Sequence, residues 1–113
     1  MAASLDQPSS ETFRALGDPV RCTIVEYLGD HGDTNVNDLA ALFPISLQAV
    51  SKHIKVLQAA GVVSQRRDGR HRPVALQTSA VAEAADWLDQ RRRQLETRYE
   101  RLDEVLADLQ GET

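Results

Sequence analysis

The sequence lacks several features that define other classes of protein. It has 113 residues and a single cysteine, Cys22, so it cannot form an internal disulfide and contains no Cys-x-x-Cys pair. No apolar run approaches the roughly 20 residues that a membrane span requires. The N-terminal stretch MAASLDQPSS also lacks the basic start and apolar core of a secretion signal. We therefore expect a chain of the cytoplasm that contacts no membrane.

Sequence patterns of the common catalytic sites are missing as well. The chain contains no G-x-S-x-G nucleophile motif, no P-loop and no H-E-x-x-H metal motif. An enzyme would need a nucleophile with its base, a phosphate-binding loop or a set of metal ligands. We predict that the protein is not an enzyme, that it has no catalytic residues, and that it holds neither a cofactor nor a metal.

What the chain does have is an uneven distribution of charge. The formal net charge is −4, but residues 46–78 carry six basic side chains against one acid, a net of +5. Residues 1–45 carry two basic side chains against seven acids, and residues 79–113 carry five against nine. A basic block between two acidic blocks indicates that one face of the protein meets an anionic partner.

Four short helices are predicted from their start and stop signals, at residues 9–17, 19–29, 36–43 and 46–61. Asp18 followed by Pro19 is typical of a helix start, and Asn35 and Ser46 can cap the third and fourth helices. Pro44 disfavours helical geometry at the residue before it, so the third helix should end there. Residues 29–35 read as a polar loop. The tight turn between the last two helices predicts a helix-turn-helix.

Two strands are predicted after the fourth helix, at residues 62–67 and 70–77. They flank Asp68-Gly69, a strong signal for a two-residue hairpin turn. With that turn, Val63 lies opposite Val74, and Pro73 faces Ser64 in a pair that makes no ladder hydrogen bonds.

A single long helix is predicted from residue 79 to residue 109. Leu88, Leu95, Leu102 and Leu109 recur every seven residues, which is typical of a helix that pairs with another helix. Val81, Ala85, Tyr99 and Leu106 add to this apolar side, and Arg92 is its one polar interruption. The seam is too long for so small a domain to cover, so we expect a homodimer.

The basic block has the composition of a DNA-binding surface. On a helical wheel, Val50, Ile54 and Leu57 share the side of the fourth helix that should be buried. The other side carries Leu47, Gln48, Ser51, Lys52 and Lys55 and no acid. Gln and Ser can pair with base edges, Leu can touch a thymine methyl, and Lys can reach phosphates. An ordinary solvated helix is the alternative, but the helix-turn before it and the arginine-rich hairpin after it favour DNA binding.

Three stretches of the chain resemble a known family. FRALGDPVRCTIVEYL, VNDLAALFPISLQAVSKHIKVLQAAGVVSQRRDGRHR and the terminal helix resemble the ArsR/SmtB family of winged-helix transcriptional regulators over about residues 11–109. The resemblance implies a mainly α winged helix-turn-helix, with four helices, a small β-hairpin and a long terminal helix that dimerises. It also implies a homodimeric repressor that binds double-stranded DNA at an inverted-repeat operator. A transcriptional activator of the same fold remains an alternative, as does a non-enzymatic adaptor that binds a protein through the terminal helix.

The pattern and the resemblance together predict three segments and two sets of residues. The segments are a flexible tail (1–8), a DNA-binding core (9–78) and a dimerisation helix with a short tail (79–113). The DNA-binding set consists of Ser46, Leu47, Gln48, Ser51, Lys52, His53, Lys55, Arg66, Arg67, Arg70, His71 and Arg72. His53 and His71 are read as DNA-facing or partly packed, and a role as metal ligands is the alternative. The dimer set consists of Phe13, Leu16, Val81, Leu88, Arg92, Leu95, Tyr99, Leu102, Leu106 and Leu109.

The chain departs from the metal-sensing members of the family. One family site uses a Cys-x-Cys pair in the third helix, where this chain reads NVNDLAALF. Another uses Asp and His from paired terminal helices, but residues 79–109 contain no histidine. His31 with Asp30, Asp33 and Asp38 could form a weak cation site, although a loop and a helix start explain these residues more simply. The effector therefore stays unknown.

Overall fold

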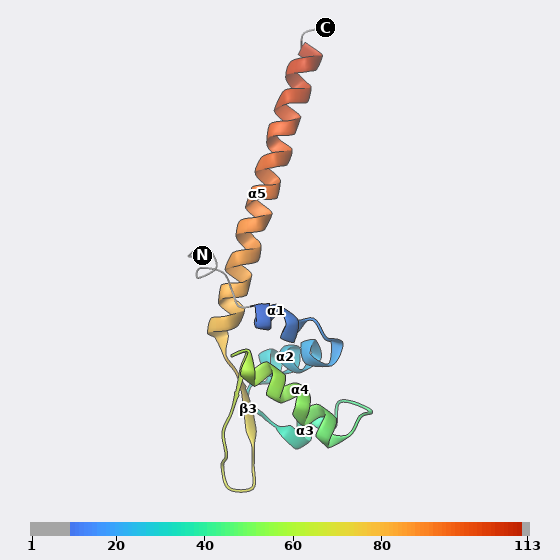
Figure 1. The fold of residues 1–113 in the computed structure, drawn as a ribbon, viewed down its shortest axis with the longest axis vertical. Coiled ribbons are helices and arrows are strands. Elements are labelled where there is room, and N and C mark those ends of the chain that lie inside the picture. Colours follow the sequence, from blue (N-terminus) through green and yellow to red (C-terminus); the bar gives the residue numbers. More distant parts are fainter. Residues whose placement is uncertain (1–9, 112–113) are drawn as a thin grey trace.

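The protein is a small winged helix from which one long helix projects (Figure 1). The computed structural model describes residues 10–111. Its elements are α1 (Ser10–Leu16), α2 (Pro19–His31), β1 (Thr34–Asn35), α3 (Val36–Ala40), α4 (Leu47–Ala59), β2 (Val63–Gln65), β3 (Pro73–Leu76) and α5 (Thr78–Gly111). This confirms the predicted class, a mainly helical winged helix-turn-helix with a small antiparallel sheet. The predicted tail at residues 1–8 and the first residue of the predicted helix 9–17 lie outside the described residues.

The helix α2 starts where the sequence predicts, but it ends later than predicted. The Asp18 carboxylate accepts hydrogen bonds from the backbone N–H groups of Val20 (2.9 Å) and Arg21 (3.1 Å), as an N-cap should. The predicted stop at Gly29 is wrong, because the helix continues to His31 and ends at Gly32, whose φ is 80°. Glycine inside a helix costs only about 1 kcal/mol, so Gly29 alone cannot end it.

The helix-turn-helix is built by caps on both sides of its second helix. Ser46 Oγ accepts the N–H of Ala49 at 3.1 Å and starts α4 as predicted. At the other end Gly61 adopts a φ of 77°, and Val62 N–H donates to the Leu57 carbonyl at 2.9 Å in a Schellman arrangement.

The third helix is shorter than predicted. It ends at Ala40 instead of Phe43. The N–H groups of Leu42 and Phe43 donate to carbonyls three residues back, those of Leu39 (3.1 Å) and Ala40 (3.2 Å), and so tighten the chain into turns. Asn35 occupies the N-cap position of α3, but its side chain makes no capping hydrogen bond.

The sheet has a third strand that the sequence did not predict. The order is β1-β3-β2, with both pairs antiparallel, and β1 pairs Thr34 with Val74 and Asn35 with Pro73. The expectation of a plain loop at 29–35 was therefore wrong. A strand of two residues is too short to show a period-2 pattern in the sequence.

The hairpin turn lies one residue later than predicted. Asp68 and His71 exchange two backbone hydrogen bonds of 2.9 Å, so Gly69 and Arg70 form the two-residue loop. Gly69 has a φ of 63° and no other residue of the loop has a positive φ, as in a type II′ turn with glycine in the first central position.

This turn shifts the strand register by two residues. Val63 pairs with Leu76 instead of Val74, and Ser64 pairs with Ala75 instead of Pro73. The expected pair without ladder bonds at Pro73 was also wrong, because the Pro73 carbonyl accepts the N–H of Arg66 at 3.2 Å. A shift of two keeps every side chain on its face, so Val63 and Val74 are both buried as expected.

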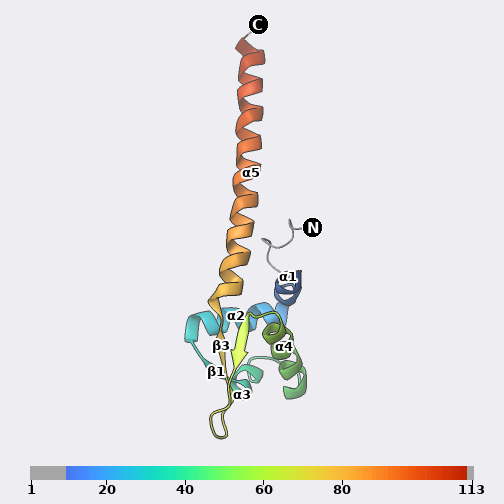
Figure 2. The ribbon, with the colours of Figure 1, turned by 60° about the vertical axis from the view of Figure 1, so that its left-hand side comes forward.

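One core joins the helices to the sheet. Its largest fully buried side chains are Ile24, Leu39, Val50, Ile54, Leu57, Val62, Val63 and Val74. By contrast α5 buries only Ala84, although it has 34 residues and a length of about 51 Å at the standard helical rise. The molecule is therefore elongated, 75 × 34 × 21 Å, with α5 leaving the end of the body opposite to the hairpin tip (Figures 1 and 2). No helix in residues 10–111 is long and apolar enough to cross a membrane.

Candidate nucleic-acid interface

The second helix of the helix-turn-helix presents a polar face. Within α4, Val50, Ile54 and Leu57 are at most 1% exposed, so they fix which side faces the core. The residues predicted for DNA contact lie on the remaining surface: Ser46, Leu47, Gln48, Lys52 and Lys55 are exposed and Ser51 is half-buried. Leu47 keeps 45% of its surface accessible, so an apolar contact is available beside the polar ones.

This face and the wing enclose one groove, the wing being the hairpin of β2, β3 and residues 66–72. The groove has a volume of about 630 Å³ and is lined by Leu47 and Ser51 from α4 and by Arg70, His71 and Arg72 from the wing. The start of α3 closes it with Asn35, Val36, Asn37 and Asp38. Two regions that are distant in sequence thus form one concave surface, and Asp38 is the only acid in its lining.

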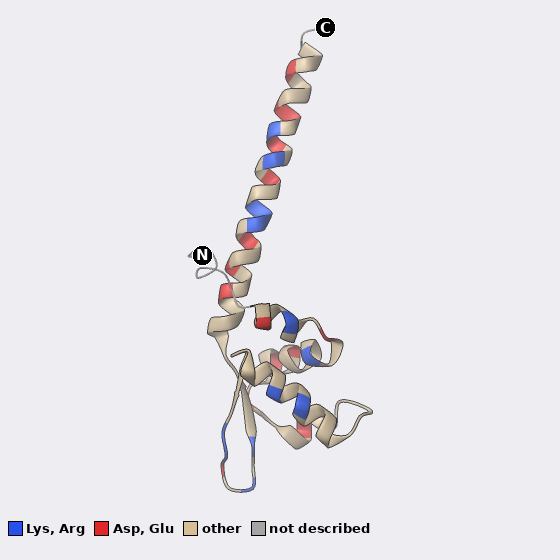
Figure 3. Ribbon diagram, in the orientation of Figure 1, with Lys and Arg blue, Asp and Glu red and all other residues tan. Residues whose placement is uncertain are grey.

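The positive charge of this surface is mostly unpaired. Of the wing arginines, Arg66 donates to the Asp33 carboxylate at 3.1 Å. Within residues 10–111 no ion pair involves the other cations of the predicted set: Lys52, Lys55, Arg67, Arg70 and Arg72. Figure 3 shows the lysines on α4 and the arginines along both arms of the hairpin. An unpaired cation keeps its charge available for a phosphate.

The wing and α4 also border a second, smaller hollow of about 210 Å³. Gln58 of α4 and Gln65, Arg66, Arg67 and Arg72 of the wing line it. Arg72 therefore borders both hollows, at the place where the wing meets α4.

Of the two predicted histidines, only His71 lies in the groove. His71 is exposed, and its Nδ1 lies 3.3 Å from the side-chain amide nitrogen of Asn35. His53 instead packs against the start of α2, where its Nδ1 lies 3.1 Å from Arg21 Nη1 and 3.7 Å from the Asp18 carboxylate. For His53 the geometry thus favours packing over facing DNA. The helical wheel could have predicted this packing. His53 lies on the same side of α4 as the buried Val50 and Leu57, three residues before it and four residues after it.

The start of α2 is an electrostatic cluster that sequence reasoning missed. Arg21 donates to the carbonyl of Ala15 at 2.7 Å and so ties α1 to α2, while its guanidinium meets His53 of α4. The N–H of Arg21, aided by the nearby charges of His53 and Arg21, holds the pKa of Asp18 below its ordinary value. The cluster joins three helices and fixes the position of α4 relative to the body.

The predicted dimer residues fall into two groups. On α5, Leu88, Leu95, Tyr99, Leu102, Leu106 and Leu109 are 48–59% exposed. Phe13, Leu16 and Val81 make contacts within the chain instead. The Phe13 ring meets Trp87 edge-on at 5.5 Å, and Leu16 and Val81 pack on the core. Arg92 forms ion pairs with Asp89 (2.6 Å) and Glu96 (2.9 Å) on the same helix.

His31, Asp33 and Cys22 each make a contact within the chain. Within residues 10–111 no three His, Cys, Asp or Glu side chains gather closely enough to hold a metal ion. His31 stacks on Tyr27 with 4.0 Å between ring centroids, and Asp33 is paired with Arg66. The half-buried Cys22 thiol donates to the Leu16 carbonyl at 2.7 Å.

Comparison with known proteins agrees with this geometry. A model of the MarR family matches residues 18–72, from the cap of α2 to Arg72 of the wing. The transcriptional repressor SdpR of Bacillus subtilis (strain 168) is 32% identical over 79 residues, which cover 70% of this chain and 87% of that protein. The HTH-type transcriptional regulator Rv2034 of Mycobacterium tuberculosis (strain ATCC 25618 / H37Rv) is 40% identical over 77 residues, 68% of this chain and 71% of that one.

A solved structure extends the likeness beyond the winged core. The ArsR-like transcriptional regulator from Rhodococcus sp. RHA1 matches with a TM-score of 0.71 and 28% identity over 85% of this chain and 90% of its own. The chain belongs to the ArsR/SmtB family of winged-helix transcriptional regulators. The MarR-family match is confined to the segment from α2 to the wing. It therefore identifies the winged helix and does not extend to α1 or α5. Members of the ArsR/SmtB family are regulators of transcription and not enzymes, as the sequence predicted.

Proposed function

We propose that this ArsR/SmtB-family protein is a homodimeric repressor of the cytoplasm that binds an inverted-repeat operator through α4 and the wing. The observation that carries the proposal is the shared groove between α4 and the wing, which the unpaired Arg70 and Arg72 line. The same two elements carry three more unpaired cations: Lys52, Lys55 and Arg67. A folded surface that served only solubility would pair or alternate its charges. Repression is inferred from relatives such as SdpR, whose name describes a repressor.

Each side chain of the interface has a role that its chemistry supports. Gln48 and Ser51 can pair with base edges in the major groove, and Leu47 can touch a thymine methyl. Lys52, Lys55 and the unpaired wing arginines (Arg67, Arg70 and Arg72) neutralise phosphates, and an arginine at the wing tip suits a narrow minor groove. The free N–H groups at the start of α4 add an anion site beside Ser46. His53 is left out of direct contact because it packs against Arg21.

The dimer follows from the exposed leucines of α5. A contiguous row of half-exposed leucines is unusual for a monomer and marks an interaction surface. A two-fold dimer would present two α4 helices to one duplex, about 34–36 Å apart, and would read two half-sites about one turn apart. The effector that releases the operator is not assigned.

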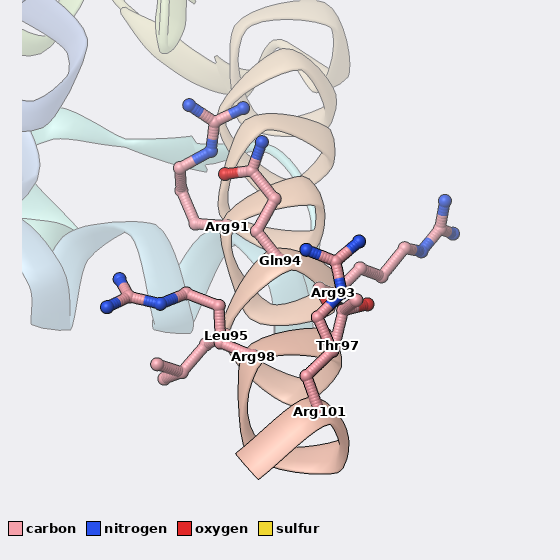
Figure 4. Close-up of a pocket in the computed structure, with 7 residues that line it drawn as sticks. All are labelled: Arg91, Arg93, Gln94, Leu95, Thr97, Arg98 and Arg101. Carbon is pink, nitrogen blue, oxygen red and sulfur yellow. The ribbon is translucent and has the colours of Figure 1, made fainter. Parts of the chain in front are cut away.

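The test is operator binding by a variant of the interface. DNA fragments selected by the wild-type protein supply the operator, and fluorescence anisotropy at moderate salt gives the affinity. Lys52→Ala with Arg70→Ala should weaken binding to the operator and to unrelated DNA alike. As a matched control, Arg93→Ala with Arg101→Ala removes the same charge from α5, away from the groove, and should bind like wild type (Figure 4).

Two results would overturn the assignment. One is a folded Lys52→Ala, Arg70→Ala variant whose operator affinity equals that of wild type. The other is a wild-type protein that elutes from DNA resin without any dependence on salt, as an adaptor with an incidental basic face would.

A further inference from the structure

The smaller hollow, at the base of the wing, is lined by hydrogen-bond donors and by no acid. It has a volume of about 210 Å³ and lies between the last turn of α4 and the two arms of the hairpin. Its lining consists of Gln58, Gln65, Arg66, Arg67 and Arg72. The guanidinium groups can only donate hydrogen bonds, and the amides can donate as well as accept. A lining of this kind suits an anion.

Two of these arginines, Arg67 and Arg72, lie directly opposite each other across the hairpin. The register is fixed by Asp68 and His71, which exchange two backbone hydrogen bonds one position nearer the turn. The next pair in an antiparallel ladder makes no ladder bonds and holds its side chains closer together. Like charges in directly opposite positions destabilise a sheet. Within residues 10–111 neither Arg67 nor Arg72 has an ion-pair partner, so no acid offsets this repulsion.

The two acids that adjoin these arginines do not line the hollow. Asp33 accepts a hydrogen bond from Arg66 at 3.1 Å and so neutralises only the arginine that is not part of the opposed pair. Asp68 follows Arg67 in the chain, and successive side chains of an extended arm point to opposite faces. The charge that faces the hollow is therefore that of the opposed pair.

The end of α4 does not counteract this positive charge. The last carbonyl groups of a helix carry the negative end of its dipole and would repel an anion if they were free. Those of residues 56 to 58 instead accept the backbone N–H groups of residues 60 to 62, at 2.9 to 3.1 Å. The exposed Gln58 side chain then adds an amide donor to the hollow from the side of the helix.

We propose that the smaller hollow binds one tetrahedral oxyanion of the phosphate or sulfate class between Arg67 and Arg72. A dianion at this place replaces the repulsion of the two guanidinium groups by two charge-assisted contacts, and Gln58 and Gln65 add amide donors. The volume corresponds to roughly seven waters, which leaves room for the anion and part of its hydration shell. The inference goes beyond the proposed function, because the site needs no DNA. A free oxyanion and a backbone phosphate share this chemistry, and the experiment distinguishes them.

Titration of the free protein with sodium sulfate, at an ionic strength held constant with sodium chloride, tests the site. The side-chain amide NMR signals of Gln58 and Gln65 should shift and saturate, with a dissociation constant on the order of 5 mM because the hollow is open to solvent. Arg67→Gln should weaken this binding about tenfold. The matched control is Arg70→Gln, which removes the same charge from the same hairpin at a residue outside the lining and should keep the sulfate response.

Thermal melting provides an independent readout of the opposed arginines. In chloride buffer at low ionic strength, Arg67→Gln should melt a few degrees above wild type, because it removes a repulsion. With a dissociation constant of about 5 mM, 20 mM sulfate should raise the Tm of wild type by about 4 °C and that of Arg67→Gln by much less. Amide signals that do not move with sulfate, or an equal sulfate response in wild type and Arg67→Gln, would overturn the proposal.

The same NMR titration in the presence of operator DNA identifies the source of the oxyanion. If a backbone phosphate fills the hollow, the operator itself shifts both amide signals and sulfate then adds nothing. If the ligand is a free oxyanion, sulfate still shifts them in the complex. It then also weakens operator binding more than chloride of equal ionic strength does, because Arg72 lines the larger groove as well. Either result supports the site.

The outcome is separable from that of the proposed function. Sulfate binding is read in the free protein, whereas the DNA assignment is read from operator binding by the variant of Lys52 and Arg70. A protein that binds sulfate in the hollow and ignores DNA would refute only the proposed function. A protein that binds its operator but shows no sulfate response would refute only the oxyanion site.

Discussion

The wing offers a sharp test of the proposed interface, because one of its arginines is held in an ion pair and another is not. Arg72 has no ion-pair partner in residues 10–111, whereas Arg66 is held by Asp33 at 3.1 Å. Replacing Arg72 with alanine removes a free charge at the junction of the wing and α4. It keeps the backbone bond from Val36 N–H to the Arg72 carbonyl, so the fold should be unaffected.

The size of the effect follows from counterion release. Each phosphate contact contributes about −0.9 to the slope of log K against log salt. At 0.1 M salt this corresponds to about an eightfold change in affinity per contact, or roughly 1.2 kcal/mol. A dimer has two wings, so Arg72→Ala should weaken binding by roughly sixtyfold and flatten the slope by about 1.8.

Fluorescence anisotropy with an operator duplex between 50 and 300 mM salt measures both quantities, and thermal melting checks the fold. The control is Asp33→Asn with Arg66→Ala, which removes an ion pair without changing the net charge. Its slope should change by less than half as much as that of Arg72→Ala. An unchanged slope for Arg72→Ala, or an equal change in the control, would refute the idea that free arginines of the wing contact phosphates.

Four further predictions concern recognition, assembly, the signal and pH. Gln48→Ala or Ser51→Ala should relax preference at one base position by about 1–3 kcal/mol in competition between operator variants, and an equal loss on all sequences would contradict direct readout. Leu95→Glu with Leu102→Glu should give a monomer or an unfolded chain in sedimentation; a folded dimer with intact operator binding would exclude α5 as the interface. Calorimetric titration with zinc, nickel and cobalt should show no stoichiometric site, and a site whose occupancy weakens operator binding would prove this wrong. The lowered pKa of Asp18 means that its carboxylate stabilises the fold above its unfolded pKa of about 4 and stops doing so as pH falls through the lowered value. The difference in Tm between wild type and Asp18→Asn should therefore be largest near pH 7 and shrink as the pH falls below 4, and a difference independent of pH would contradict it.

Local chemistry made the helix starts predictable. The caps at Asp18 and Ser46 are short-range features, since each side chain bonds an N–H two or three residues later. The hairpin register was not predictable in the same way. Asp68-Gly69 and Gly69-Arg70 are both reasonable two-residue loops, and the two choices differ by an even register shift that buries the same residues.

Long-range contacts limited the prediction of the site. The wheel identified the exposed face of α4 because burial of Val50, Ile54 and Leu57 is a periodic property of one helix. The pairing of Arg66 with Asp33 and of Arg21 with His53 joins residues 33 and 32 positions apart, and no local pattern encodes such contacts. These two contacts decide which cation is already neutralised and which histidine packs away from the groove.

The placement of charge along the molecule explains how an acidic chain can bind an acidic polymer. The net charge is −4, yet the acids are concentrated in residues 1–45 and 79–113, and the latter lie almost entirely on a helix that leaves the body opposite to the wing. At physiological salt, exposed charges are largely screened beyond about 8 Å. Most of α5 is much farther than this from the hairpin tip, since the helix alone is about 51 Å long. DNA at the groove therefore meets the basic segment 46–78 and little of the charge of α5, and Asp38 is the one acid in the groove lining.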